Sequence, residues 1–404
     1  MKKIFILFIT LISIYSQSLS YEQYIWTTNN DYLETNSSDF KSNDENNNIL
    51  NLESGSAILI EQNTGQILYS HNIHEKLRPA SVTKIMSVLL IMEQIDSGKL
   101  SYSDSISCSE TATAMGGSQI WLDTNETLTV DEMLKAICIV SANDCVVAMA
   151  EHIAGSEQAF VQMMNDKAKE LGMNDTTFKN CHGIDEDGHL TSAYDIAIMS
   201  KELLTKHPDI KKYTTTWMDS LRNGKSELVN TNKLIRSYKG ITGLKTGSTS
   251  LALYNLSASA TRDDLSLIAV IMKAPSTKIR FSEATKLLDY GFSKFTYKKL
   301  ATSNDIIQNV SINKGTKKSI NAIIKQDTGT IIEKGQESRI NQSIKINDNI
   351  QLPISKGDVI GQLTISLDDK TLNTIDLISD LDVDKINLFN MTKKTIYSWI
   401  NLLR

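Results

Sequence analysis

The sequence of 404 residues lacks several features that would assign it to common functional classes. Its 42 basic and 47 acidic residues give a net charge of −5, and no lysine or arginine stripe crosses its interior. Nothing therefore favours nucleic-acid binding. The six histidines and four cysteines form no cluster with zinc-site spacing, which argues against a metallopeptidase. The length and the 41% of hydrophobic residues suit one large domain and a smaller one.

The cysteines also form no recognisable disulfide framework. Cys138 and Cys145 lie on what reads as one helix, about two turns apart, which is too far for a disulfide. Cys108 and Cys181 are isolated in the sequence. We therefore expect free and mostly buried thiols.

The N-terminal apolar run is too short to cross a membrane. It extends from residue 4 to residue 15 after two lysines, and Ser18 and Ser20 provide small residues at the −3 and −1 positions of a cleavage site. A transmembrane anchor, the alternative, needs roughly 20 apolar residues. Residues 1–20 are therefore predicted to be an export signal.

The next segments differ sharply in composition. Residues 21–53 are dense in Asn, Ser, Thr and acids, and such a segment buries too little apolar surface to order itself, so we predict a flexible tether. Residues 54–297 follow the order strands, helices, strands, helix. This order predicts an α+β domain whose first and last strands pair in one sheet around an inserted helical block. The expected strands are 56–61, 66–69, 241–247, 254–260 and 265–272, and the main expected helices are 81–97, 129–139, 143–154, 156–171, 192–206 and 277–291.

The C-terminal part of the chain contains two further segments with different sequence patterns. Residues 298–383 contain short strand patterns separated by glycine turns, which predicts a small all-β, sandwich-like domain. In residues 384–404, Trp399 and other apolar residues recur near helical spacing, and every charge after Asp384 is basic. An amphipathic helix of this kind suits an anionic membrane surface. A helix that docks on its own domain is the alternative.

Three short motifs carry the chemistry. Ser81–Lys84 (S-V-T-K), Ser141–Asn143 (S-A-N) and Lys245–Gly247 (K-T-G) appear in this order. Each is weak alone, because residues 38–41 and 311–314 also fit S-x-x-K without opening an apolar helix. The context of each motif therefore decides its interpretation.

Ser81 and Lys84 stand at the start of a predicted buried helix. Pro79 favours a first helical turn, and the residues that follow are apolar nearly all round. Ser81 and Lys84 share one helix face, and burial lowers the pKa of an ammonium group, so Lys84 is a candidate base. The N–H groups of the helix N-terminus suit an oxyanion. The plainer alternative is a capping serine with a lysine that reaches solvent.

The second motif is predicted on a tight turn between two helices. From such a turn the Ser141 hydroxyl could pass a proton between Lys84, Ser81 and a leaving amine, and Asn143 could hold the substrate amide. A serine that only caps a helix is the alternative.

The third motif lies on the predicted strand 241–247. An edge strand can pair with an extended peptide, and Gly247 would let the ligand backbone approach closely. Lys245 and the hydroxyls of Thr246 and Thr249 would offer charge and hydrogen bonds to a terminal carboxylate. A solvated turn is the alternative.

Together, in this order, the motifs match the set found in penicillin-binding proteins and class A β-lactamases. From about residue 54 to 404 the chain resembles the low-molecular-weight penicillin-binding proteins, which are serine D-alanyl-D-alanine carboxypeptidases of peptidase family S11. The segments that carry this likeness are Arg78–Met86, Gly117–Ser118, Ser141–Asp144, Asn180–Gly183, Asn230–Asn232, Gly243–Gly247, Leu287–Phe292 and Pro353–Gly361.

The resemblance implies a β-lactamase/transpeptidase-like catalytic domain in an exported enzyme at the outer face of the cytoplasmic membrane, with no cofactor. Ser81 would attack the carbonyl between the two D-alanines that end a peptidoglycan stem peptide, with Lys84 as the base. The N–H groups of Ser81 and Ser248 would form the oxyanion hole. β-Lactam antibiotics would acylate the same serine.

The resemblance also assigns the substrate carboxylate to Lys245 and Thr246, with Arg280 as a supporting residue. Three positions depart from the usual family residues without removing a catalytic group. They are Thr242 in place of an acid, Cys181 in place of a proline, and Leu253 in place of a glycine, where leucine would narrow the floor beneath the substrate.

Three other functions remain open on the motifs. A class A β-lactamase needs a glutamate in an E-x-x-L-N pattern, and the nearest candidate, Glu227–Asn230, has the wrong spacing. A DD-endopeptidase, which cuts cross-links, has the same motifs. A non-catalytic wall-binding protein is disfavoured because all three motifs are intact.

Overall fold

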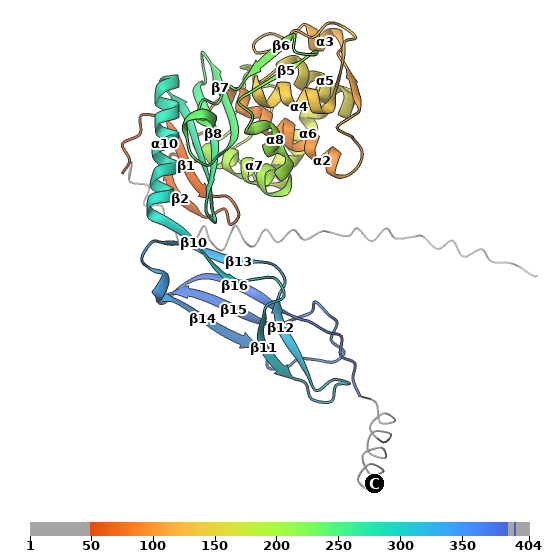
Figure 1. Ribbon diagram of the computed structural model, residues 1–404, viewed down its shortest axis with the longest axis vertical. Coiled ribbons are helices and arrows are strands. Elements are labelled where there is room, and N and C mark those ends of the chain that lie inside the picture. Colours follow the sequence, from red (N-terminus) through yellow and green to blue (C-terminus); the bar gives the residue numbers. More distant parts are fainter. Residues whose placement is uncertain (1–48, 387–391, 393–404) are drawn as a thin grey trace, which may run out of the picture. The chain divides into compact units, whose positions relative to one another are not determined.

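A computed structural model describes residues 49–386 and residue 392 (Figure 1). The predicted export signal lies outside the described residues. So do the predicted tether and the predicted amphipathic helix, apart from their inner ends. The described residues form a large α+β region followed by an all-β region, which confirms the predicted fold class.

The first and last strands of the α+β region form one antiparallel sheet, as predicted. The strand order is β2-β1-β9-β8-β7, so strands from the two ends of the region meet where β1 pairs with β9. The strand β7, which carries the K-T-G motif, lies at one edge of the sheet, also as predicted. The bounds are β1 Ser56–Glu61, β2 Ile67–His71, β7 Ile241–Thr249, β8 Leu253–Arg262 and β9 Leu265–Ala274.

Both faces of this sheet are covered, because successive side chains of a strand point to opposite faces. On β1, Ala57 and Leu59 join a buried cluster with Leu287 of helix α10 (Thr277–Lys294). Ile58 and Ile60 join the larger cluster of the helical block. Figure 1 shows α10 along one side of the sheet and the helical block on the other.

The helical block follows the predicted helices closely because its termini carry strong local signals. Thr129 and Glu132 form a capping box at the start of α4. The hydroxyls of Ser156 and Ser192 accept N–H groups at the starts of α6 and α7. The bounds are α2 Lys84–Asp96, α4 Val130–Ile139, α5 Asn143–Ala154, α6 Glu157–Glu170 and α7 Ala193–Lys206.

The structure corrects two expectations in this block. The helix predicted from residue 81 begins as a 3₁₀ turn, η1 (Ala80–Thr83), and becomes α-helical only at Lys84. Cys138 and Cys145 lie on two different helices, α4 and α5, because the S-A-N motif breaks the chain between them. All four cysteines are free and buried, as predicted.

Several short elements were not predicted, because stretches of three or four residues carry little periodicity. Two small hairpins, three short α-helices and one 3₁₀ turn complete the block. They are β3 Ser105–Ser107 with β4 Thr127–Thr129, β5 Met218–Leu221 with β6 Ser226–Val229, α3 Glu110–Thr113, α8 Lys211–Thr214, α9 Leu234–Ser237 and the 3₁₀ turn η2 Pro208–Ile210.

The all-β region contains a five-stranded sheet of order β11-β12-β16-β15-β14 and a two-stranded pair, β10 with β13. Its core is aliphatic, with Ile320, Ile324, Leu363, Ile365 and Leu377 nearly inaccessible. The bounds are β10 Phe295–Ala301, β11 Ile306–Ser311, β12 Ser319–Ile324, β13 Thr328–Glu333, β14 Ile340–Ile346, β15 Val359–Leu367 and β16 Lys370–Ser379.

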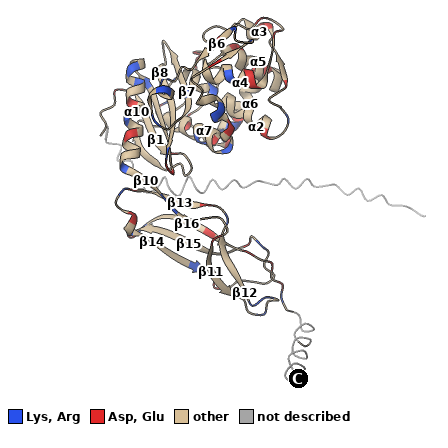
Figure 2. Ribbon diagram, in the orientation of Figure 1, with Lys and Arg blue, Asp and Glu red and all other residues tan. Residues whose placement is uncertain are grey.

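Basic and acidic residues are interspersed over the helical block and along α10 (Figure 2). Several of them pair locally, as Lys167 does with Glu93 at 2.9 Å. The two lysines of the motifs, Lys84 and Lys245, differ from these surface charges because they are buried.

Candidate active site

Ser81 lies on a tight turn between Pro79 and helix α2. The preceding residue, Ala80, is buried and has a φ of +50°, a left-handed conformation that residues with a side chain seldom adopt. Val82 and Thr83 are also buried, whereas Ser81 is only partly covered. The turn therefore presents the Ser81 hydroxyl at the margin of the core.

The amine of Lys84 is fully buried beside this serine. Its Nζ lies 3.2 Å from Ser81 Oγ, 2.6 Å from Asn143 Oδ1 and 2.6 Å from the backbone carbonyl of His182. Burial lowers the pKa of Lys84 well below its ordinary value, and the nearby positive charge of Lys245 lowers it further. Both causes favour the neutral form of the amine.

The S-A-N motif forms the expected turn, between α4 and α5. Ser141 has a φ of +68°, and its buried hydroxyl has no hydrogen-bond partner among the described residues. Such a buried orphan is unusual in proteins and suits a group that is completed by a ligand or a reacting atom.

Asn143 makes three hydrogen bonds to neighbouring segments, and its predicted contact with the substrate amide stays a prediction. Its Oδ1 accepts from Lys84, its Nδ2 donates to Gly116 O at 2.6 Å, and its N–H donates to Ser118 O at 2.7 Å. Its side chain therefore holds the lysine against a neighbouring loop, which leaves only one amide hydrogen for a substrate. The next residue, Asp144, fixes the same loop by accepting from the N–H groups of Ile120 and Leu122.

Lys245 and Thr246 lie buried on β7. Lys245 Nζ donates to Thr246 O at 2.9 Å, and Thr246 Oγ1 donates to Thr231 Oγ1 at 2.7 Å. Burial lowers the pKa of Lys245 to about 7, and the positive charge of Arg280 lowers it as well. A carboxylate beside this lysine would raise its pKa again and keep it protonated.

Gly247 has a role that the sequence did not indicate. A side-chain carbon at this position would lie 2.9 Å from the backbone nitrogens of Ser81 and Val82 and 2.9 Å from Pro79 O. The glycine therefore lets β7 pack directly against the turn that carries Ser81. The predicted close approach of a ligand backbone at Gly247 stays a prediction.

The residues that follow Gly247 divide between exposed and structural positions. Ser248 is exposed. Thr249 Oγ1 accepts from the N–H of Ala252 at 2.9 Å and so stabilises the turn after β7. This contact gives Thr249 a structural role that we had not expected.

Arg280 reaches the same strand from α10. Its Nη1 donates to Gly247 O and to Asn255 O, at 3.2 Å each, and its guanidinium stacks on Phe281. Burial lowers the pKa of Arg280 to about 10. The arginine therefore links β7 and β8 through their backbone carbonyl groups.

Sequence reasoning missed the contribution of the loop between α6 and α7. The His182 carbonyl accepts from Lys84, whereas the sequence assigns the Asn180–Gly183 segment no role beyond the family likeness. Two buried histidines brace this loop. The Nδ1 of His182 accepts from the N–H of Ile184, and the Nδ1 of His189 accepts from that of Lys179. The sequence signal for these contacts is the presence of two histidines in one short polar loop.

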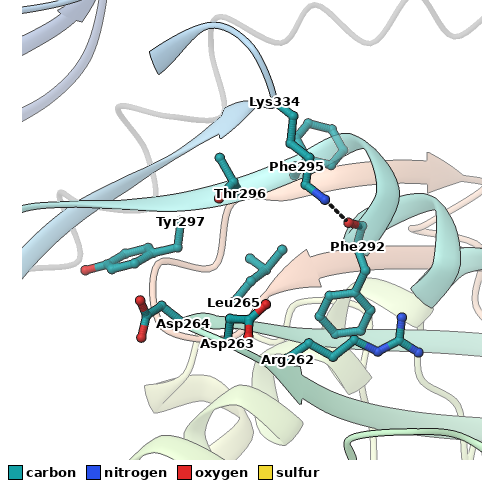
Figure 3. Close-up of a pocket in the computed structure, with 9 residues that line it drawn as sticks. All are labelled: Arg262, Asp263, Asp264, Leu265, Phe292, Phe295, Thr296, Tyr297 and Lys334. Atoms are coloured by element: carbon teal, nitrogen blue, oxygen red, sulfur yellow. Dashed lines mark hydrogen bonds between the residues drawn. The ribbon is translucent and has the colours of Figure 1, made fainter. Parts of the chain in front are cut away.

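A separate pocket of about 280 Å³ contains none of the motif residues (Figure 3). Its two cationic groups already have partners: Lys334 Nζ donates to Phe292 O, and the Arg262 guanidinium lies 4.5 Å from the Phe292 ring. We do not assign it a function. Its lining residues are Arg262, Asp263, Asp264, Leu265, Phe292, Phe295, Thr296, Tyr297 and Lys334.

Comparisons with known proteins agree with the resemblance. A family model described as D-alanyl-D-alanine carboxypeptidase matches residues 40–276, and one described as the penicillin-binding protein 5 C-terminal domain matches residues 295–385. The D-alanyl-D-alanine carboxypeptidase DacF of Bacillus subtilis is 45% identical over 351 residues, which cover 86% of this chain and 90% of that protein.

Solved structures show the same architecture. Penicillin binding protein 5 from Haemophilus influenzae has a TM-score of 0.76 at 31% identity, covering 83% of this chain and 98% of its own. Penicillin-binding protein D2 from Listeria monocytogenes, solved in an ampicillin-bound form, has a TM-score of 0.56 at 29% identity. It covers 60% of this chain and 99% of its own.

The buried histidines predict a pH dependence of stability. Burial lowers the pKa of His182 from 6.5 to about 3 and that of His189 from 6.5 to about 4. Below pH 6.5 the unfolded chain binds protons that the folded chain excludes, so the free energy of unfolding falls as the pH decreases towards 4. For His189 the loss corresponds to about 3 kcal/mol.

Urea unfolding between pH 7 and pH 4 measures this loss. The variant His189→Gln keeps a donor and an acceptor but does not titrate, so its stability should fall less steeply than that of the wild type. Parallel pH profiles for the two proteins would contradict this assignment.

Proposed function

The chain belongs to peptidase family S11, the D-alanyl-D-alanine carboxypeptidases, and from this membership we propose a serine mechanism with Ser81 as the nucleophile. The enzyme removes the terminal D-alanine from peptidoglycan pentapeptides through an acyl-enzyme. The observation that carries the proposal is the buried Lys84 amine, 3.2 Å from Ser81 Oγ.

Lys84 is the base in this mechanism. A neutral amine has two N–H donors and one lone pair. The two donors suffice for Asn143 Oδ1 and the His182 carbonyl, which leaves the lone pair for the proton of Ser81. As Ser81 Oγ attacks the carbonyl carbon, that proton passes to Lys84, and the lysine becomes charged only when the reaction needs it.

The oxyanion and the leaving group complete acylation. The N–H groups of Ser81 and Ser248 donate to the developing oxyanion, since Gly247 packs against the Ser81 nitrogen and brings β7 beside it. When the tetrahedral intermediate collapses, the C–N bond breaks and D-alanine leaves. Its nitrogen takes a proton from Lys84 through the Ser141 hydroxyl. Water then hydrolyses the ester and releases the shortened peptide.

Substrate recognition uses the edge strand β7. An extended peptide can add to this edge by main-chain hydrogen bonds. Lys245 and Thr246 bind the terminal carboxylate, and Arg280 holds the strand by its bonds to Gly247 O and Asn255 O. A β-lactam places its own carboxylate there and acylates Ser81 with no amine to release.

The location of the enzyme is a further part of the proposal. The catalytic region lies outside the cytoplasmic membrane in this proposal, and the C-terminal helix lies on the membrane surface. The predicted export signal, the predicted tether and the predicted amphipathic helix support this location. No helix among residues 49–386 and 392 combines the length and hydrophobicity needed to span a bilayer. From the basic residues and the apolar spacing of residues 384–404, we propose peripheral attachment by the C-terminal helix.

Acylation of Ser81 by benzylpenicillin tests the proposed nucleophile. Mass spectrometry after incubation should find the adduct on the peptide that contains Ser81, and a pentapeptide ending in D-Ala-D-Ala should release D-alanine. Ser81→Ala should lose the adduct and lower the release rate at least about a thousandfold. The matched control is Ser311→Ala, which alters the S-x-x-K serine of the all-β region and should keep both activities. An adduct on another residue, or D-alanine release by Ser81→Ala at close to the wild-type rate, would refute the proposal.

Removal of residues 385–404 tests the membrane proposal. The truncated mature protein should move from the membrane fraction to the soluble fraction after cell lysis, because the apolar face and the basic residues of the tail are lost. Retention of benzylpenicillin binding by the truncated protein provides the control for folding. Unchanged membrane association would contradict the proposal.

A further inference from the structure

The peptide unit between Ala80 and Ser81 is held in one orientation from several sides. In a trans peptide the carbonyl and the N–H point in opposite directions. Any group that holds the Ala80 carbonyl therefore also sets the direction of the Ser81 N–H. Because Ala80 has a φ of +50°, this peptide needs such support.

Thr83 and His189 supply a hydrogen-bonded support for this carbonyl. Thr83 Oγ1 donates to Ala80 O at 2.8 Å, and His189 Nε2 lies 2.8 Å from the same hydroxyl. Since the single hydroxyl proton of Thr83 goes to Ala80, the histidine must be the donor to Thr83. The other ring nitrogen, Nδ1, accepts from the N–H of Lys179 at 2.9 Å, which is consistent with that tautomer.

Close packing fixes the same peptide unit on both sides. A side-chain carbon at Gly183 would lie 2.0 Å from Ala80 O, and one at Gly247 would lie 2.9 Å from Ser81 N. The loop and β7 thus sandwich the peptide. Asn255 of β8 adds a bond to the preceding unit, because its Nδ2 donates to Pro79 O at 2.9 Å. The hydrogen bonds then select the orientation within this sandwich.

We propose that Thr83 and His189 are positioning residues for the oxyanion hole: they hold the Ala80 carbonyl and thereby direct the Ser81 N–H towards the oxyanion. The inference rests on the proposed function, since the N–H matters only if Ser81 is acylated. Both side chains are buried, at 0% and 2% exposure, so they act through the backbone and not on the substrate.

Thr83→Val is the direct test, because valine has the same shape and lacks the hydroxyl. Loss of a whole oxyanion donor lowers kcat by about 10²–10³-fold. A donor that is misdirected but still present should cost about 10–100-fold. We expect this loss in the first-order rate of Ser81 acylation by benzylpenicillin and in kcat for D-alanine release. The Kd of the pre-acylation complex and the KM should stay unchanged, because the ground state does not use the donor.

Conservative variants separate positioning from general packing. Thr83→Ser keeps the hydroxyl and should acylate at nearly the wild-type rate. His189→Gln keeps a donor for Thr83 and an acceptor for Lys179 and should also be active, whereas His189→Leu should show the loss seen in Thr83→Val. A peptide boronic acid, whose tetrahedral adduct places an oxygen in the oxyanion position, should bind Thr83→Val more weakly by the same factor as kcat falls.

The outcomes distinguish this inference from the proposed function. Wild-type acylation rates in Thr83→Val and His189→Leu would refute the positioning role and leave the serine mechanism intact. Equal losses in Thr83→Val and Thr83→Ser would also refute it, because the hydroxyl would then not matter. Absence of a Ser81 adduct in the wild-type protein would refute the proposed function and this inference together. If Thr83→Val fails to fold, as judged by thermal melting, the His189 pair decides.

Discussion

An amine without access to water is the constraint on which this site depends. Lys84 is buried between the core and the Ser81 turn, and a charged ammonium there would lose the stabilisation that water provides. Three oxygen atoms lie next to Lys84 Nζ. They are Ser81 Oγ, Asn143 Oδ1 and the backbone carbonyl oxygen of His182. Two of them satisfy a neutral amine, and the third is the hydroxyl that loses its proton in the proposed mechanism. Burial and hydrogen bonding together thus favour the neutral amine and the direction of proton transfer that we propose.

The fold meets this constraint by bringing together segments that are far apart in the sequence. Strand β7 packs its Gly247 against the Ser81 nitrogen, and the loop packs its Gly183 against the Ala80 carbonyl. Neither contact leaves room for a side-chain carbon, so the Ala80–Ser81 peptide is packed between two backbone segments. The sheet makes this possible because its strands come from both ends of the α+β region, with β7 at the edge facing the inserted helices. The same edge remains free to receive an extended peptide.

Local signals explain which parts could be predicted from the sequence. The helices α4, α6 and α7 begin at Thr129, Ser156 and Ser192, whose capping side chains identify a helix start without tertiary information. The motif order identified the family. The 3₁₀ turn at Ala80, the engagement of Asn143 and the role of Gly247 were not predictable, because each depends on a contact between distant segments. His189, for example, meets Thr83 across 106 positions of sequence. Buried, hydrogen-bonded groups of this kind leave no periodic pattern.

Two lysines in one site have different surroundings, and this difference separates their tasks. Lys84 is buried away from water and its pKa is lowered further by Lys245, whereas the pKa of Lys245 would be raised again by the substrate carboxylate of the proposed mechanism. The central claim is that the surroundings of Lys84 lower its pKa and so favour the neutral amine that the proposed mechanism uses. Titration of ε-¹³C-labelled lysine by NMR, with Lys84 assigned by comparison with Lys84→Arg, tests it directly. A pKa well below the ordinary lysine value of about 10.4 is the predicted result. A Lys84 resonance that titrates near 10.4 would contradict the account.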